Sequence, residues 1–553
     1  MVHTQPPSRS NSTWSSANHS TKVNTPGDAR SGVDGGEKEG GAQYGCIIGG
    51  KYIGETQESD FDSSYGPLTK IDGVDIPLTS TEELHEDGKD YIVLRFASND
   101  RANPYKWRPA YKLMITTMLN TMTLFIGLAT TAYSSGIDSM AADLNSTALI
   151  GQVGLFTFNI ACAIAPLFLA PFCEMVGRKI VYVGGYFCFS LLFIGLALGQ
   201  TIGTIVGLRL LLGLFGCIGT ILVGGTFDDM YEPKERSQPM AVFSYVAIVG
   251  TVGAPIYAGF IDQTIGWRWI EGVQGLANIP LLVILVVFFK ETRGGVTLHK
   301  RAKALRNATG DERYVAFDDI ATPNWKVMLK ASSVKAIQML FSEPVVFAFG
   351  LWIGFTWFVV FLFLSVIPIT FSEKRGWSEG VSGLPYISLV IGTTLGWIAH
   401  QFQMRKYNKL LEDPNRKITP EDRLYGAMIG AVFLPIGLFI YSFTQYGYLP
   451  WIAPTIALAP IAFGIYFVFE STYSYTADCY GDSASSAIAG QGFLRNTLGA
   501  VSPLFASQFF HNVGSQYAGL ILSILSLVLS LIPFVAFKYG HLLRARSRLA
   551  IEY

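Results

Sequence analysis

Residues 344–369 read PVVFAFGLWIGFTWFVVFLFLSVIPI and contain no charged side chain. A helix needs roughly 20 apolar residues to cross the hydrocarbon core of a bilayer. This run is therefore expected to form a transmembrane helix, and eleven further runs have a comparable length and composition. We predict twelve membrane spans, at residues 113–133, 151–172, 180–199, 202–226, 239–261, 272–289, 344–369, 381–401, 425–443, 448–475, 485–510 and 515–537.

The spans fall into two groups of six, separated by a charged stretch. Only 15% of the residues are charged, whereas a soluble domain carries about 25%. The chain is therefore expected to be an all-α polytopic membrane protein with two six-helix pseudo-repeats, and not a soluble globule. The predicted segments are a disordered cytoplasmic tail at 1–105, a helical half at 106–290, a central loop at 291–342, a second half at 343–540 and a tail at 541–553.

The first hundred residues are rich in Ser, Thr, Asn, Gly and Asp, as in SRSNSTWSS at residues 8–16. Such a composition cannot bury enough apolar surface to offset the entropy lost on ordering. Residues 91–96, which read YIVLRF, could form a strand or a docking segment, although the surrounding composition favours weak order.

Lys and Arg are concentrated in alternate loops. They lie before the first span, after the second (Arg178, Lys179) and the fourth (Lys234, Arg236), in the central loop, after the eighth span and at the C-terminal end. The alternate loops are poor in them, apart from the loop with Lys374 and Arg375. The positive-inside rule then places both termini and the central loop in the cytoplasm. The triplet Asn145-Ser146-Thr147 falls in the first outward loop, where Asn145 is a candidate for glycosylation unless it lies too close to the bilayer.

The loop after the second span reads APFCEMVGRK over residues 170–179. Gly177 suits a tight turn, because glycine adopts backbone conformations that other residues avoid. Glu174 lies four residues before Arg178 and Lys179, so a salt bridge could hold the turn as a latch. A weaker copy of this pattern follows the eighth span, as structural repeats would produce.

Charged residues also occur within or at the ends of the predicted spans. An ionisable group in a span is costly, so it should face the interior and have a partner. Asp138 could be the partner of Arg209, but a structural ion pair or snorkelling would explain Arg209 equally well. Glu470 is a lone acid among Phe, Val and Tyr, where desolvation and rewetting could make it carry a proton. The candidates for proton coupling are Asp138, Arg209, Glu470, Asp478 and Arg495.

The fifth span contains GTVGAPIYAG at residues 250–259. Small residues at helical spacing let helices approach closely, and a proline inside a helix kinks it. The residues that define this pattern are Gly250, Gly253, Pro255 and Gly259.

Together these patterns resemble those of the major facilitator superfamily. The loop after the second span is similar to the family pattern G-x-L-a-D-r-x-G-r-k, with Ala170 for the first Gly and Glu174 for Asp. Arg209 fits the pattern R-x-x-q-G except that Leu212 replaces Gln, and the fifth span looks like the G-P-x-x-G-G antiporter motif with two glycines replaced by alanines. Further matches to fungal drug:proton antiporters lie at residues 103–107 (NPYKW), 266–269 (GWRW) and 291–293 (ETR).

The resemblance implies two six-helix halves that rock around a central site. It implies a gating cluster at the inner mouth, formed by Glu174, Gly177, Arg178, Lys179, Asp228 and Asp229. It also implies that the first, fourth, seventh and tenth spans line a solute cavity, although each aromatic side chain there could instead pack against lipid. The candidates for the cavity are Asn120, Tyr133, Trp352, Trp357, Phe358, Tyr466 and Tyr473.

We therefore expect a monomeric transporter of the plasma membrane that exports a small organic solute, such as a drug, metabolite, organic acid or glycolipid, in exchange for protons. Uptake, facilitated diffusion and a non-transporting membrane sensor are the alternatives. Membrane lipid is an expected partner and nucleic acid is not. The six cysteines lack ligand spacing, so we expect buried thiols, no metal and no cofactor. No Ser/His/Asp or phosphate-loop constellation suggests an enzyme.

Overall fold

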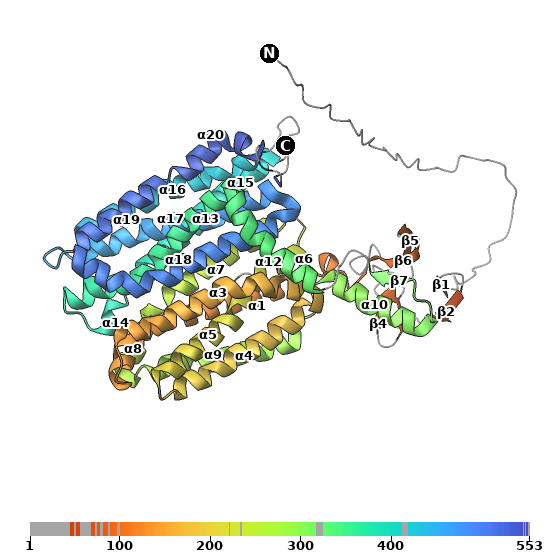
Figure 1. Cartoon of the computed structure of the whole chain (residues 1–553), viewed down its shortest axis with the longest axis horizontal. Coiled ribbons are helices and arrows are strands. Elements are labelled where there is room, and N and C mark those ends of the chain that lie inside the picture. Colours follow the sequence, from red (N-terminus) through yellow and green to blue (C-terminus); the bar gives the residue numbers. More distant parts are fainter. Residues whose placement is uncertain are drawn as a thin grey trace, which may run out of the picture.

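Long apolar helices dominate the structure, arranged in two halves that lie side by side (Figure 1). This computed structural model describes residues 45–48, 51–55, 68–71, 74–77, 81–86, 89–96, 100–220, 222–232, 235–316, 325–411, 419–545, 547 and 549–550. A small group of strands lies beside helix α10 (Gly294–Thr309) at one end of the bundle. We call this the inner end, because the charge pattern of the sequence predicts that it faces the cytoplasm.

The first half runs from Pro109 to Phe288. Its helices are α1 (Pro109–Ala132), α2 (Ile137–Asp143), α3 (Ala148–Val176), α4 (Arg178–Leu198), α5 (Ile202–Gly216), α6 (Leu222–Met230), α7 (Ser237–Gly253), α8 (Pro255–Ile265) and α9 (Arg268–Phe288). Short 3-10 turns lie at η1 (Pro104–Lys106), η2 (Tyr133–Gly136) and η3 (Cys217–Gly219).

The second half begins at Pro344. Its helices are α13 (Pro344–Pro368), α14 (Glu379–Ser382), α15 (Tyr386–Leu411), α16 (Leu424–Thr444), α17 (Ile452–Tyr480), α18 (Ala484–Val513), α19 (Ser515–Leu529) and α20 (Ile532–Ala545). A π turn, η4 (Ile369–Glu373), and 3-10 turns η5 (Pro420–Arg423) and η6 (Gly481–Ser483) complete it. The described part of the expected central loop includes helices α10 and α12 (Trp325–Ser342).

Eleven helical stretches in the described ranges are long and apolar enough to cross a membrane, and each matches a predicted span. The remaining predicted span, 485–510, lies in α18, which is long enough at 30 residues. This helix is less apolar because it carries Gln491, Arg495 and Asn496, all of which are buried. These side chains face other helices and not lipid, so the predicted all-α fold of two halves is confirmed.

Proline and small residues shape the contact between the halves. The fifth span is divided at Pro255, where α7 ends and α8 begins, as the loss of a backbone donor predicts. The two halves meet where α18 packs on α3, α15 on α7 and α14 on α8. In the middle of this interface, the Asn496 side-chain amide donates to the Cys162 carbonyl at 3.0 Å. Cys162 is a free thiol, as are Cys173, Cys188, Cys217 and Cys479.

The tail that we predict to be disordered, residues 1–105, includes residues that form strands in the structure. Lys89–Leu94 forms strand β6, which pairs antiparallel with β5 (Thr81–Glu86) and parallel with β7 (Tyr314–Ala316) of the central segment. Val93 and Leu94 are buried there, and their apolar area offsets the cost of ordering. Residues 1–44 lie outside the described residues. The other strands are β1 (Gly45–Ile48) with β2 (Lys51–Glu55), and β3 (Leu68–Ile71) with β4 (Val74–Pro77).

A buried ion pair ties this N-terminal segment to α10. Arg301 donates to both carboxylate oxygens of Asp100, and the two residues are 2% and 3% exposed. A charge pair this deeply buried depends on both partners, because either group alone would lack solvent.

We expect Asp100→Asn to loosen strand β6, because it leaves Arg301 buried without a counter-ion at a cost of about 3–5 kcal/mol. Hydrogen exchange of the amides of residues 89–96, followed by mass spectrometry, measures this loosening. Asp143→Asn is the matched control, since the Asp143–Arg268 pair of α2 and α9 is partly exposed, and exposed ion pairs contribute little to stability. Equal exchange in both variants would contradict the role of the buried pair.

Candidate functional site

The turn between α3 and α4 is held by the carboxylate of Glu291, a residue that lies just after α9. Gly177 has φ +106°, a conformation that favours glycine. The two carboxylate oxygens of Glu291 accept the backbone amides of Arg178 at 2.8 Å and Lys179 at 3.1 Å. These amides belong to the first turn of α4, where a negative charge is favoured by the helix dipole. A side chain at residue 177 would collide with this carboxylate, so the glycine is required by space as well as by φ.

The predicted pairing of Glu174 with Arg178 is wrong. Glu174 is exposed, and the Arg178 Nε donates to Asp229 Oδ2 at 2.9 Å. Arg293, which follows Glu291 in the ETR sequence, also contacts Asp229, at 3.3 Å. The expected inner-mouth cluster therefore exists around Asp229, with Glu291 and Arg293 in place of Glu174.

Asp228 lies at the edge of this cluster. Its carboxylate contacts Arg236 at 2.6 Å, and its carbonyl accepts the hydroxyl of Tyr105 at 2.7 Å. Burial, together with the nearby carboxylates of Asp229 and Asp228, raises the pKa of the Tyr105 hydroxyl, so Tyr105 stays a hydrogen-bond donor. The segment before α1 is thus attached to the same cluster.

Arg209 lies fully buried in α5, facing the other helices of the first half. It donates to the carbonyls of Ala129 and Thr130, both at 2.9 Å. Its guanidinium also covers the rings of Tyr133 at 4.3 Å and Phe158 at 4.8 Å. The arginine is therefore an anchor between α1, α3 and α5.

The carboxylate nearest to Arg209 is Glu271 of α9, at 3.9 Å, and not Asp138 as expected. Asp138 is exposed near the outer end of the bundle. Glu271 could have been found from the sequence, because this acid lies shortly after Trp269, at the start of a largely apolar run. Our predicted span began at residue 272, so this acid was assigned to a loop.

The glycines of the fifth span pack against two different neighbours. A Cβ on Gly250 would lie 2.9 Å from the Leu124 carbonyl oxygen of α1, and a Cβ on Gly259 would lie 2.7 Å from the Glu379 carbonyl oxygen of α14. Around Gly253 the nearest atom is a Leu128 methyl at 3.8 Å. Gly259 therefore permits close contact between the two halves at the outer end, and Gly253 does not take part.

A polar contact reinforces this outer closure. The Gln263 side-chain oxygen of α8 accepts the backbone amide of Gly380 in α14 at 3.3 Å, so it joins the two halves. Within the first half, Asp262 of α8 accepts the Ser139 hydroxyl, with distances of 2.6 and 2.8 Å to its two carboxylate oxygens.

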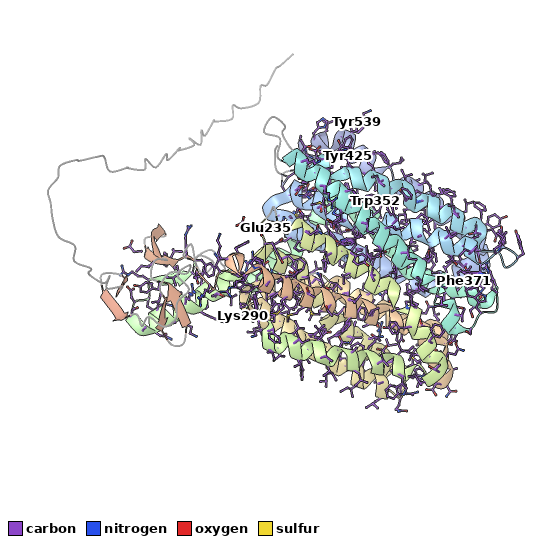
Figure 2. The ribbon with its side chains drawn as sticks, turned by 180° about the vertical axis from the view of Figure 1, so that it is seen from behind. Glu235, Lys290, Trp352, Phe371, Tyr425 and Tyr539 are labelled. Atoms are coloured by element: carbon purple, nitrogen blue, oxygen red, sulfur yellow. The ribbon has the colours of Figure 1, made fainter. Side chains whose placement is uncertain are left out.

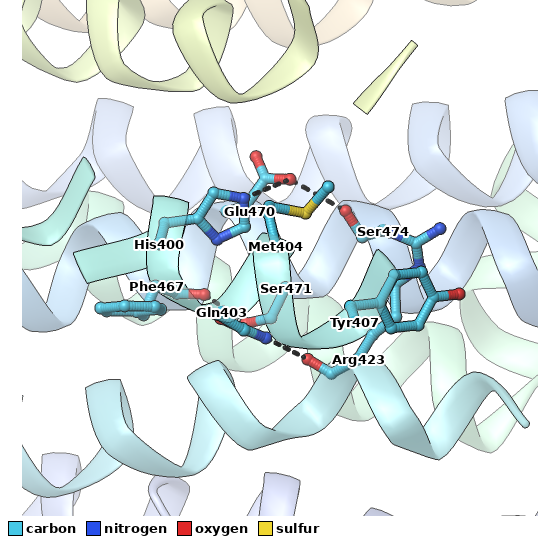
Figure 3. A pocket seen from close by; sticks show the side chains of 9 residues that line it. All are labelled: His400, Gln403, Met404, Tyr407, Arg423, Phe467, Glu470, Ser471 and Ser474. Carbon is cyan, nitrogen blue, oxygen red and sulfur yellow. Dashed lines mark hydrogen bonds and ion pairs between the residues drawn. The ribbon is translucent and has the colours of Figure 1, made fainter. Parts of the chain in front are cut away.

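Glu470 of α17 lies in a pocket near the inner end (Figure 3), and both of its carboxylate oxygens accept hydrogen bonds. Oε2 accepts the Ser244 hydroxyl from α7 at 2.8 Å, and Oε1 accepts the Ser474 hydroxyl at 3.0 Å. His400 of α15 places Nε2 at 3.9 Å from Oε1. Because Ser244 belongs to the first half and Glu470 to the second, this carboxylate connects the halves.

The pocket is small, with a cavity volume of about 20 Å³, and is formed by the eighth and tenth predicted spans and by η5. His400 was not among the predicted site residues, although a histidine in the last turn of a predicted span was a usable signal. Its two ring nitrogens are buried and make no hydrogen bond to the described residues. The residues that line the pocket are His400, Gln403, Met404, Tyr407, Arg423, Phe467, Glu470, Ser471 and Ser474.

The other two coupling candidates of the second half lie apart from Glu470. Asp478 forms an ion pair with Arg423 at the inner end. Arg495 of α18 is 3% exposed, donates to the Tyr473 hydroxyl at 2.8 Å and lies 4.8 Å from the Trp357 ring. Two predicted cavity residues, Tyr473 and Trp357, are thus brought together by a buried cation.

The remaining cavity candidates are dispersed. Tyr466 is buried beside the Glu470 pocket, with its ring 5.9 Å from that of His400. Trp352 is fully buried against Phe349 of its own helix, and Asn120 is buried in α1. Tyr133 lies under Arg209, and Phe358 is only partly buried. The exposed Asn145 lies in the turn between α2 and α3, with φ 49°.

We expect Gly259→Ala to open the outer end, because the added methyl group cannot fit against the α14 backbone and overpacking costs about 1–3 kcal/mol. Labelling of a Ser382→Cys reporter, buried in α14, by a water-soluble thiol reagent should become roughly five- to hundredfold faster.

Gly253→Ala is the matched control for this prediction, since its methyl group would meet only a Leu128 methyl at an ordinary contact distance of 3.8 Å. If both alanine variants label at the wild-type rate, the outer closure does not depend on Gly259.

Comparisons with known proteins agree with this architecture. The sequence profile of the Major Facilitator Superfamily matches residues 118–501. A multidrug transporter of that superfamily from Aspergillus fumigatus is 32% identical over 82% of this chain and 75% of its own. An efflux pump from Trichophyton rubrum is 30% identical over 84% of this chain and 78% of its own. The crystal structure of a peptide transporter bound to alafosfalin covers 80% of this chain and 98% of its own, with a TM-score of 0.56 at 13% identity. The chain belongs to the Major Facilitator Superfamily and is a membrane transporter.

Proposed function

We propose that this transporter exports a small organic solute in exchange for protons, and that Glu470 carries the coupling proton. Relatives named as a multidrug transporter and an efflux pump support export. The observation that carries the coupling is the hydrogen bond from Ser244 to Glu470, which joins the two halves beside a pocket at the inner end. Uptake of a solute is the alternative direction for the same site.

The chemistry of this contact links proton binding to movement. A carboxylate accepts hydrogen bonds from two hydroxyl groups at once, and a hydrogen bond to a charged group is worth about 1.5–3 kcal/mol. Protonation of Glu470 weakens the hydrogen bond that Glu470 accepts from Ser244. It also removes any attraction to a protonated His400. The inner contact between α7 and α15–α17 is then less stable, so the proton favours separation of the halves at this end.

The outer end opens in the other stage of the transport cycle. There Gly259 lets α8 meet α14, and the acidic residues Asp262 and Glu379 belong to these two facing helices. Opening of the outer end would expose this pair to the external medium. Alternating access then consists of exchanging one closed end for the other, with protons taken up outside and released through the Glu470 pocket.

The location that we propose follows from charge and from the relatives. The inner end carries α10 and the basic segments, so it faces the cytoplasm and the outer end faces the exterior of the cell. Export then protects the cell or delivers a metabolite across its plasma membrane. The aromatic rings beside Arg495 and Glu470 suit an amphipathic solute that uses both apolar and polar contacts.

We expect Glu470→Gln to abolish export driven by a pH gradient while downhill exchange of the same solute continues. Glutamine keeps the size and polarity of the side chain but cannot release a proton. The solute is first chosen by growth of a host expressing the protein on a panel of toxic compounds, and its flux is then measured in inside-out vesicles. Unchanged gradient-driven flux in Glu470→Gln would exclude this residue as the proton carrier.

A matched serine pair tests the link between the halves. Ser244→Ala and Ser474→Ala each remove one hydroxyl from Glu470, but only Ser244 belongs to the opposite half. Losing the cross-half bond should make the inner end open more often, about tenfold or more for a cost of 1.5–3 kcal/mol. Thiol labelling of a Gln403→Cys reporter measures the opening. Similar labelling in both variants would show that Ser244 does not hold the inner end closed.

A further inference from the structure

Glu271 of α9 is a buried acid that the proposed transport cycle does not use. It is 2% exposed, and neither of its carboxylate oxygens accepts a hydrogen bond from the described residues. Gln274 follows one turn later on the same face of the helix. Its amide group is also buried and forms no hydrogen bond within the part of the chain that the structure describes. A carboxylate that is buried without donors is costly, so the protein must gain something from this acid.

Glu271 lies at the outer end of the bundle, in the first turn of α9. Lys290, which follows the other end of this helix, is at the end of the bundle that carries α10 (Figure 2). A helix of this length spans about 30 Å, so the two residues are far apart. Ile270, directly before Glu271, belongs to the same buried cluster as Ala258 of α8. The acid is therefore next to the helix that meets the second half at Gly259.

Arg209 lies between this acid and the end of α1. Its Nη1 donates to the Ala129 carbonyl at 2.9 Å and is 3.9 Å from Glu271 Oε1, so the same nitrogen faces both partners. Its Nη2 donates to the Thr130 carbonyl at 2.9 Å. At 3.9 Å the charges attract each other, but the distance is too long for a hydrogen bond. In this conformation the guanidinium is bonded to α1, and Glu271 is left without a donor.

Two opposing effects act on the charge of Glu271. Burial without donors favours the neutral carboxylic acid, whereas Arg209 and the start of α9 favour the carboxylate. A shift of about 1 Å would bring the guanidinium and the carboxylate to the hydrogen-bond distance of about 2.8 Å and favour the charged form. A small movement of α1 relative to α9 is therefore enough to change the protonation of this acid.

The other titratable groups around this part of α9 are phenols. Tyr133 of η2 and Tyr257 of α8 are close enough to interact electrostatically with Glu271. Tyr186 of α4 donates to Asn278, two turns further along α9. Phenols ordinarily titrate at a pH of about 10, so they carry no charge at physiological pH. Among these groups, Arg209 is the one whose charge acts on Glu271.

We propose that Glu271 is a second proton-binding site, loaded from the outer side during export. This inference rests on the proposed exchange of solute for protons. When the outer end opens, a proton from external water would form an O–H bond with a carboxylate oxygen of Glu271. When Arg209 approaches, its charge favours the carboxylate, and the proton passes to water on the side that is then open.

The end of α1 connects this site to the outer closure. The Thr131 hydroxyl donates to the Thr251 carbonyl of α7 at 2.7 Å, four residues before the break at Pro255. Movement of α1 is thereby transmitted to the predicted span that carries Gly259. Protonation of Glu271 releases its attraction for Arg209, so the proton would favour one position of α1 and its loss the other.

Infrared difference spectroscopy of the purified full-length protein detects the C=O stretch of a protonated carboxyl group. Exposed Asp and Glu titrate at a pH of about 4, so a carboxyl band that grows as the pH falls from about 8 to about 6 arises from buried acids. Glu271→Gln should remove one component of this band, and Glu470→Gln should remove a different one. The matched control is Glu312→Gln, which changes an exposed acid in the segment after α10 and should leave the band unchanged. If Glu271→Gln loses no more of the band than this control, the proposal is overturned.

Transport separates a coupling role from a purely structural one. In vesicles, Glu271→Gln should exchange about one proton fewer per solute molecule, read from the pH gradient that balances a given solute gradient. An unchanged ratio would overturn the coupling role.

A second variant covers the case in which Glu271→Gln does not fold. Glu271→Asp should keep the band component but move it to the position of an aspartic acid, and a component that does not move would overturn the proposal. The infrared readout of Glu271 does not depend on Glu470, so it would persist if Glu470 proved not to carry the coupling proton.

Discussion

A charged group inside an apolar bundle must find its partner within the protein, because hydrocarbon offers none. Arg209 meets this demand with Glu271 and two backbone carbonyls, and Arg495 with a neighbouring hydroxyl and amide. Glu470 finds Ser244 on the opposite half. These contacts prevent their helices from rotating toward lipid. The buried charges thus determine which face of each helix points inward, and the apolar faces are left for the membrane.

The helices could be predicted because apolar length is a local property. The run at 344–369 agrees closely with α13, and α18 reaches 30 residues although it carries buried polar side chains. Ionic partners could not be predicted in the same way. Glu174 lay one turn from Arg178 in sequence, but the structure brings Asp229 from the fourth span and Glu291 from behind the sixth. The carboxylate that pairs with Arg178 is decided by which helices are neighbours in space, and the spacing of residues in the sequence does not contain that information.

Two features show where sequence reasoning reached its limit. Strand β6 has an apolar pattern, but one of its partners, β7, lies beyond the whole first half of the bundle, and the polar composition around β6 concealed its docking. Glu470 was recognised as an isolated acid, whereas His400 and Ser244 were not connected with it. Both observations reflect the same fact, that a site made between distant helices becomes visible only when the helices are placed.

The hydrogen bond from Asn496 to the Cys162 carbonyl lies midway along α3 and α18. When two bodies rock, points near the fulcrum move little, whereas points at either end of the lever travel far. A contact at this height can persist through the whole stroke, while those of Gly259 and Ser244 at the two ends must alternate. In the proposed cycle, the contact between α3 and α18 therefore acts as a hinge. It holds the two halves together while the inner and outer ends open alternately.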